Sequence, residues 1–99
     1  MRNEVVLEGV LQSQESLRYT PAGVASFVGV LLHKIGDGET DNLNTSLNVI
    51  ITAYAELAHA LSQLDCPISV VVKGQLIKKH ANSKELVIKV NQFKLSNGV

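Results

Sequence analysis

The chain has 99 residues, enough for one domain, and its 45% hydrophobic and 18% charged residues predict a folded globular domain. Nine basic and nine acidic side chains give a formal net charge of zero, which argues against a strongly basic nucleic-acid binder. Because the sequence has no membrane-length apolar run, no recognisable secretion signal and a single cysteine, we expect a cytoplasmic protein.

Alternation of apolar and polar residues with a period of two predicts five β-strands. These strands cover residues 3–11, 24–33, 43–53, 68–78 and 85–95. In the last strand, Phe93 and Leu95 fall out of step with Ile88 and Val90. This slip predicts a bulge near Asn91 and Gln92.

Residues 54–64 break the alternation and are rich in Ala and Leu, which predicts a short helix. We expect Thr52 to be its N-cap and Pro67 to prevent its continuation. Helical spacing places four side chains on one stripe facing a core: Tyr54, Leu57, Leu61 and Leu64.

The segments between these elements carry turn and loop signals. A turn is expected at 20–23, an exposed loop at 35–42, a second loop at 80–84 and a frayed end at 96–99. No internal repeat or linker interrupts the pattern, so we expect a single domain over residues 1–99.

Five short strands with a helix between the third and the fourth predict an all-β OB-fold, a five-stranded Greek-key barrel. Three strand glycines, Gly9, Gly29 and Gly74, suit such a tightly bent barrel. A β-sandwich would need more strands than this length supplies.

The order of the motifs resembles a known family. Residues 3–11 resemble the first strand of bacterial single-stranded-DNA-binding proteins. The run Leu-Arg-Tyr-Thr-Pro-Ala-Gly-Val at 17–24, together with 30–34 and 70–76, resembles the PriB family (primosomal replication protein N), a dimeric derivative of that fold. The resemblance implies a homodimer that binds single-stranded DNA and the primosomal helicase PriA, with DnaT or single-stranded-DNA-binding protein as further partners.

The sequence departs from the family pattern at three places, one of which is a compact loop between the strands at 68–78 and 85–95. The loop at 35–39 is acidic, and the strand at 43–53 lacks an expected aromatic residue. Its outward face instead carries Asn48, Ile50 and Thr52.

Catalytic and metal-binding patterns are missing from the sequence. His33, His59 and His80 fall in different elements, and Cys66 has no partners at metal-ligand spacing. We therefore expect no enzyme, no metal site and no cofactor.

The net charge of zero hides an uneven distribution. Residues 73–94 hold six lysines and one glutamate, a formal charge of +5, whereas residues 1–65 hold three bases and eight acids, a charge of −5. Since loops beside the central strands form the usual ligand face of an OB-fold, we predict a nucleic-acid site there. Its predicted residues are Arg18, Tyr19, Lys34, Lys78, Lys79, His80, Lys84 and Lys89.

Only four aromatic residues are present, so stacking on bases is limited and binding should rely on charge and weaken with salt. Lysines at a hairpin tip can also serve only to solubilise it and to prevent edge-to-edge aggregation. A protein-interaction OB module with little DNA affinity and an RNA-binding OB domain therefore stay open as alternatives.

Outward apolar residues suggest either a homodimer interface or bending of the barrel: Val6, Val10, Val71, Ile77 and Val87.

Overall fold

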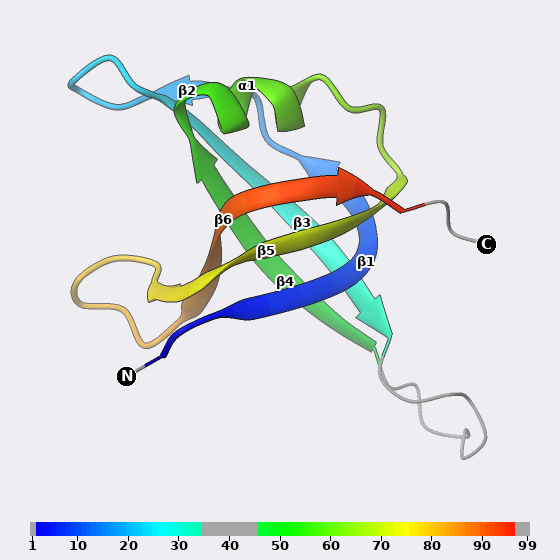
Figure 1. Ribbon diagram of the computed structural model, residues 1–99. Helices are drawn as coiled ribbons and strands as arrows, with labels where there is room; N and C mark the ends of the chain where they lie inside the picture. The colour runs from blue at the N-terminus through cyan, green and yellow to red at the C-terminus, as the bar shows by residue number, and fades with distance from the viewer. Residues whose placement is uncertain (1, 35–45, 97–99) are drawn as a thin grey trace.

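In the computed structural model, which describes residues 2–34 and 46–96, five long strands curl into a barrel with one helix across an end (Figure 1). The predicted loop at 35–42, the start of the predicted strand at 43–45 and residues 97–99 lie outside the described residues. The elements are β1 (Val5–Gln14), β2 (Arg18–Tyr19), β3 (Ala25–Lys34), β4 (Ser46–Tyr54), α1 (Ala55–Ser62), β5 (Ile68–Lys78) and β6 (Leu86–Leu95).

The strand pairing confirms the OB-fold prediction. The long strands follow the order β1-β5-β6-β4-β3, and β3 pairs back onto β1, which closes the barrel. The β4–β6 pairing is parallel, and the other pairings among the described strands are antiparallel. The helix lies between the third and fourth long strands, as predicted, and the additional two-residue β2 pairs with the start of β3.

The predicted alternation separates the core from the surface. Inward-facing residues are fully buried on all five long strands, and Ala58 and Leu61 of α1 are buried against them. Burying a large apolar side chain contributes about 1.5–3 kcal/mol, so this core is the main stabilising element. Its largest side chains are Phe27, Leu11, Leu31, Ile51, Leu61 and Ile88.

The predicted bulge in the last strand is confirmed. Lys73 pairs with Gln92, but the next residue, Gly74, pairs with Val90, so Asn91 is the extra residue. A Cβ at Gly74 would overlap the backbone carbonyl of Lys89. The close approach of β5 to β6 at this bend therefore requires glycine, as the sequence suggested.

The start of the helix differs from the prediction. Thr52 is not its N-cap, because this residue lies within β4, is buried and donates a hydrogen bond from Oγ1 to the carbonyl of Phe27 at 2.9 Å. Tyr54 occupies the cap position with extended backbone and is 39% exposed, so it does not belong to the core stripe. The strand continues to Tyr54 and the chain turns at Ala55, with φ of 60°, before helical spacing begins.

Other residues of the expected stripe, Leu57, Leu61 and Leu64, do pack in or against the core. Ser96, the first residue of the predicted frayed end, is held to β5, because its backbone N–H donates to the carbonyl of Ser69 at 2.9 Å.

Candidate nucleic-acid interface

The outer surface of β3 and β4 forms a continuous face whose centre is apolar. Because Phe27 and Leu31 point into the core, alternate residues of β3 point outward. Directly paired residues of antiparallel strands share a face, so β4 contributes the outward partners of these residues. We call this the β3–β4 face; its paired residues are Val28 with Thr52, Val30 with Ile50, and Leu32 with Asn48.

One end of the β3–β4 face carries a row of three cross-strand neighbours. Ser26 of β3 pairs with Arg18 on one side and with Tyr54 on the other. The Arg18 side chain is 76% exposed, and its ion pair with Glu15, at 3.6 Å, is a solvent-exposed contact of little strength. A cation and an aromatic ring therefore flank Ser26 on the same face, and residues of these two kinds bind the phosphate and the base of a nucleotide.

Tyr54 is absent from the predicted site because the composition of residues 54–64 assigns it to the helix. A usable signal was present, since Asn48, Ile50 and Thr52 were already placed on the outward face. Continuing that alternation by one step gives Tyr54.

Lys89 lies beside the middle of the β3–β4 face. It pairs with Thr52 of β4 on one side and with Gln75 of β5 on the other, and its side chain is partly buried. Lys89 therefore lies between Thr52 and Gln75 and adds a positive charge beside the apolar residues of the β3–β4 face.

Four predicted residues gather at the loop between β5 and β6: Lys78 ends β5, and Lys79, His80 and Lys84 lie in the loop. This loop is held by backbone bonds from Lys79 to Glu85 at 3.0 Å and from Ser83 to His80 at 2.9 Å. The Lys79 ammonium also lies 3.5 Å from the Glu85 carboxylate. Lys78 and Lys84 form no ion pair with any carboxylate of the described ranges, so both charges are available to a ligand.

The hairpin between β2 and β3 and the loop between β5 and β6 project toward the same side in Figure 1, the first beside α1 and the second at the other end of the barrel. We call two groups of candidate residues the hairpin end (Arg18, Tyr19, Tyr54 and His59) and the loop end (Lys78, Lys79, His80 and Lys84). Loops in these two positions border the ligand face of an OB-fold.

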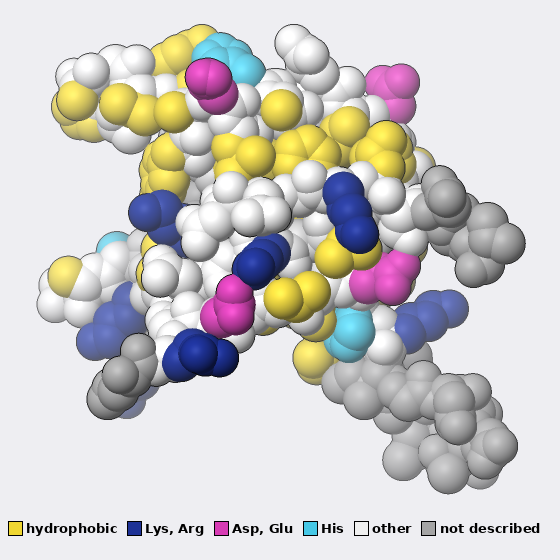
Figure 2. All heavy atoms as spheres, in the orientation of Figure 1, with side chains coloured by type: hydrophobic (Ala, Val, Ile, Leu, Met, Phe, Trp, Pro, Cys, Tyr) yellow, Lys and Arg dark blue, Asp and Glu magenta, His cyan; other side chains and the backbone are white. Residues whose placement is uncertain are grey.

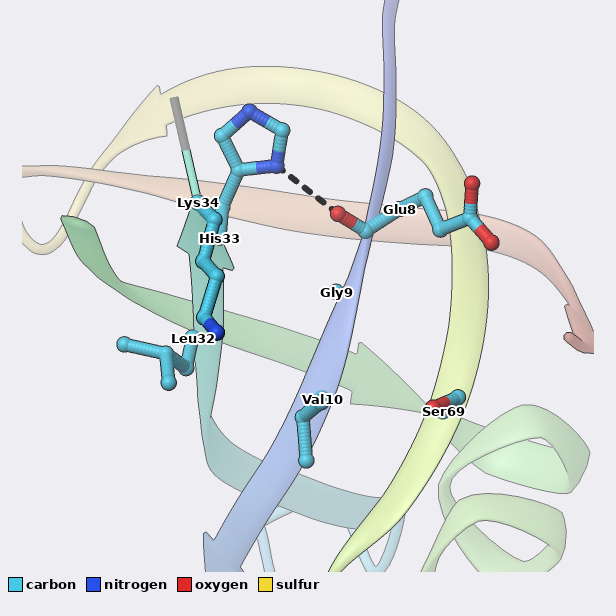
Figure 3. A pocket seen from close by; sticks show the side chains of 7 residues that line it. All are labelled: Glu8, Gly9, Val10, Leu32, His33, Lys34 and Ser69. Atoms are coloured by element: carbon cyan, nitrogen blue, oxygen red, sulfur yellow. Dashed lines mark hydrogen bonds between the residues drawn. The ribbon is translucent and has the colours of Figure 1, made fainter. Parts of the chain in front are cut away.

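Lys34 does not join either end. It is the last residue of β3, about 26 Å along the strand from Ser26, given roughly 3.3 Å per residue. Its side chain lines a hollow of about 360 Å³ where β1 separates from β3 (Figure 3). There His33 Nδ1 donates to the carbonyl of Glu8 at 2.7 Å.

Tyr19 is turned away from the β3–β4 face. It pairs with Ala25, whose side chain is buried, so Tyr19 points toward α1. Its ring centroid lies 6.3 Å from that of His59, with 56° between the ring planes.

The opposite side of the barrel carries a different charge pattern. Figure 2 looks onto β1, β5 and β6, where basic and acidic side chains are interspersed. Lys73, for example, lies 3.2 Å from the carboxylate of Glu4. This surface therefore has weaker attraction for a polyanion than the loop end.

The described residues show no other chemical centre. Among them no three His, Cys, Asp or Glu side chains gather in a way that could hold a metal ion, and no helix is long and apolar enough to cross a membrane. Burial, with a smaller effect of the Asp65 charge, raises the pKa of the Cys66 thiol and keeps it in its less reactive protonated form.

The architecture defines an OB-fold of the single-strand-binding type. PriB from Ralstonia solanacearum matches it with a TM-score of 0.82 and 23% identity, over 96% of this chain and 98% of that one. Wild-type single-stranded DNA binding protein from Thermus aquaticus matches with a TM-score of 0.75 and 23% identity, over 96% of this chain and 40% of that one.

A family model described as "Another single-strand binding protein family" matches residues 3–92, and the chain belongs to this family. No curated protein sequence matches this chain.

Proposed function

We propose that this chain is a PriB-like accessory protein of the replication-restart primosome. In this role it is a cytoplasmic, non-catalytic homodimer that binds single-stranded DNA and stabilises the helicase PriA on it, with DnaT or single-stranded-DNA-binding protein as further partners. Membership of a single-strand binding family supports the DNA ligand, and the likeness to PriB motivates the primosomal role.

The observation that carries the DNA-binding part is the distribution of cations around one face. Arg18 and Tyr54 lie at one end of the β3–β4 face and Lys89 beside its middle, while Lys78 ends β5 and Lys84 lies on the loop that follows it. A single strand of DNA that crosses this surface would meet a cation able to bind phosphate at the hairpin end, beside the middle of the face and at the loop end. The apolar centre between them would contact sugars and bases.

Binding of a labelled oligothymidylate, followed by fluorescence anisotropy, tests this proposal. With about five phosphate contacts, affinity should fall about a hundredfold between roughly 50 and 200 mM salt. The Lys78/Lys79/Lys84→Ala variant should bind much more weakly at low salt.

Other outcomes would favour the alternatives. Affinity that does not respond to salt would contradict electrostatic binding. Equally weak binding by wild type and variant would favour a protein-interaction module, and tighter binding of the matching RNA would favour an RNA-binding domain.

The homodimer has a candidate surface along β1. Residues Val5–Gly9 pair with β5 on one side, while pairing with β3 starts only at Val10, so the other edge is not covered by any described strand. Val6 is 61% exposed beside this edge. An edge of this kind can pair with the same strand of a second copy.

Light scattering tests the dimer directly. Val6→Lys should convert it to a monomer, because symmetry would place two new charges close together. Leu86→Lys is the matched control, since Leu86 is 58% exposed but lies next to the loop end. A monomeric wild type, or a Val6→Lys protein that is still dimeric, would contradict this interface.

A further inference from the structure

Two exposed rings face each other on the side of β2 that is turned away from the β3–β4 face. Tyr19 is 60% exposed, and His59 is an exposed residue of the last turn of α1. Their centroid distance of 6.3 Å and tilt of 56° are typical of an edge-to-face aromatic contact. Such a contact restrains the tyrosine ring on one side, while most of the residue stays exposed to solvent.

The position of Tyr19 is fixed by its turn as well as by His59. The backbone N–H of Thr20 donates to Val24 at 2.8 Å, and that of Gly23 donates to Thr20 at 2.8 Å. The hydroxyl of Thr20 also accepts a hydrogen bond from the Val24 N–H at 3.1 Å. Gly23 allows this tight turn because its φ is +84°.

Neither ring is required by the core. Tyr19 and His59 are absent from the buried cluster, and no side-chain hydrogen bond engages either ring within residues 2–34 and 46–96. A large exposed aromatic ring that is held in place but has no packing role is typical of a stacking surface.

The topology connects this pair with the DNA-binding face. Arg18 and Tyr19 are consecutive residues of β2, so their side chains point to opposite sides of the sheet. β2 is also the last strand in the sheet order, with no strand beyond it among the described elements. A polynucleotide that reaches Arg18 can therefore pass around the edge of β2 without obstruction from a further strand.

We infer that the Tyr19–His59 pair is a second nucleobase site, at which a single strand leaving the β3–β4 face turns around the β2 edge. The inference rests on the proposed DNA-binding function and extends it. The exposed ring of Tyr19 stacks on one base, His59 supports the ring and contributes a ring nitrogen to the nucleotide, and Arg18 holds the phosphate on the other side of the strand.

The composition of the chain permits a direct spectroscopic test. The sequence has two tyrosines and no tryptophan, so in a Tyr54→Phe protein Tyr19 is the only strongly fluorescent residue. Titration with oligothymidylate should quench this emission with the same midpoint as the anisotropy change of a labelled strand.

Binding experiments with oligonucleotides of two lengths test the path around the edge. For a strand of about 16 nucleotides, Tyr19→Ala should reduce affinity five- to tenfold, and His59→Ala about two- to threefold. For a strand of about four nucleotides, which only covers the sheet face, both losses should disappear. Tyr19→Phe keeps the stacking ring and should recover most of the affinity that Tyr19→Ala loses. Gln63→Ala changes an exposed residue at the C-terminal end of α1 and should bind like wild type.

The outcomes separate this inference from the proposed function. Normal anisotropy binding without quenching of Tyr19, or equal losses for both strand lengths, would overturn the second base site and leave DNA binding intact. Absence of binding by wild type to either strand would overturn the proposed function and this inference with it.

Discussion

The hairpin end and the loop end of the candidate interface use different physical interactions. The hairpin end presents the rings of Tyr19, Tyr54 and His59 on elements held by strand pairing and a hydrogen-bonded turn. The loop end presents exposed cations, of which Lys79 is paired with a carboxylate. Stacking needs a fixed ring, whereas a charge attracts phosphate from several ångströms away and tolerates movement.

This difference explains how a chain with no net charge can still attract a polyanion. The excess of lysine is concentrated in residues 73–94, while most acidic residues precede it. Only local charge matters at the surface, because salt screens interactions beyond about 8–10 Å. We therefore expect the loop end to determine how strongly salt weakens oligonucleotide binding. The hairpin end should determine the affinity that remains at high salt.

The largest expected effect comes from removing free cations of the loop end. Lys78/Lys84→Ala should weaken oligonucleotide binding about thirtyfold at low salt and reduce the slope of log affinity against log salt by about 1.4. Lys73/Lys94→Ala removes the same charge from the outer surface of β5 and β6, where both residues line one hollow, and it should change affinity much less. Equal losses in the two variants would show that only total charge matters.

Removing a ring from the hairpin end should have a smaller effect that salt does not alter. Tyr54→Ala should reduce affinity about tenfold at both low and high salt, because a lost stacking contact has no counterion component. Tyr54→Phe keeps the ring and should bind like wild type. If the alanine variant's loss shrank as salt rose, Tyr54 would have an electrostatic role and the distinction between the two ends would fail.

The fold could be predicted because it depends on patterns that extend over many residues. Alternation along each strand predicted the barrel and its core, and one break in the alternation predicted the bulge at Asn91. The loop-end lysines could also be grouped, because they are close in sequence.

The hairpin end was predicted less well because it depends on register. A two-residue strand such as β2 has no detectable period, and the side on which Tyr19 lies follows from its pairing with Ala25. The placement of Arg18 and Tyr54 on either side of Ser26, and the contact of Tyr19 with His59, bring together segments that lie more than thirty residues apart. Sequence alone could supply these residue types but not their neighbours.

The helix that carries His59 is attached to β1 by one side chain, which permits a test of the hairpin end's rigidity. Gln14 donates from Nε2 to the carbonyls of Leu64 at 3.1 Å and Ser62 at 3.4 Å, at the C-terminal end of α1. Gln14→Ala should lower the free energy of unfolding by about 1 kcal/mol, since carbonyls at a helix end lose their donor.

Thermal denaturation measures this change, with an expected decrease in Tm of about 4–8 °C for a domain of this size. Gln12→Ala alters an exposed residue of the same strand and should leave Tm unchanged. An unaltered Tm for Gln14→Ala would mean that α1 is held by its buried face alone.

The smallest expected effect concerns the turn that positions Tyr19. Thr20→Val keeps the shape of the side chain but removes the oxygen that accepts the Val24 N–H, so it should lower the free energy of unfolding by about 0.5 kcal/mol. Because this N–H is exposed, water replaces most of the lost bond. Thr20→Ser retains the acceptor and should match wild type in Tm. If Thr20→Val reduced oligonucleotide affinity as strongly as Tyr19→Ala does, the turn itself would contact the ligand, whereas a twofold effect or less agrees with a purely positioning role.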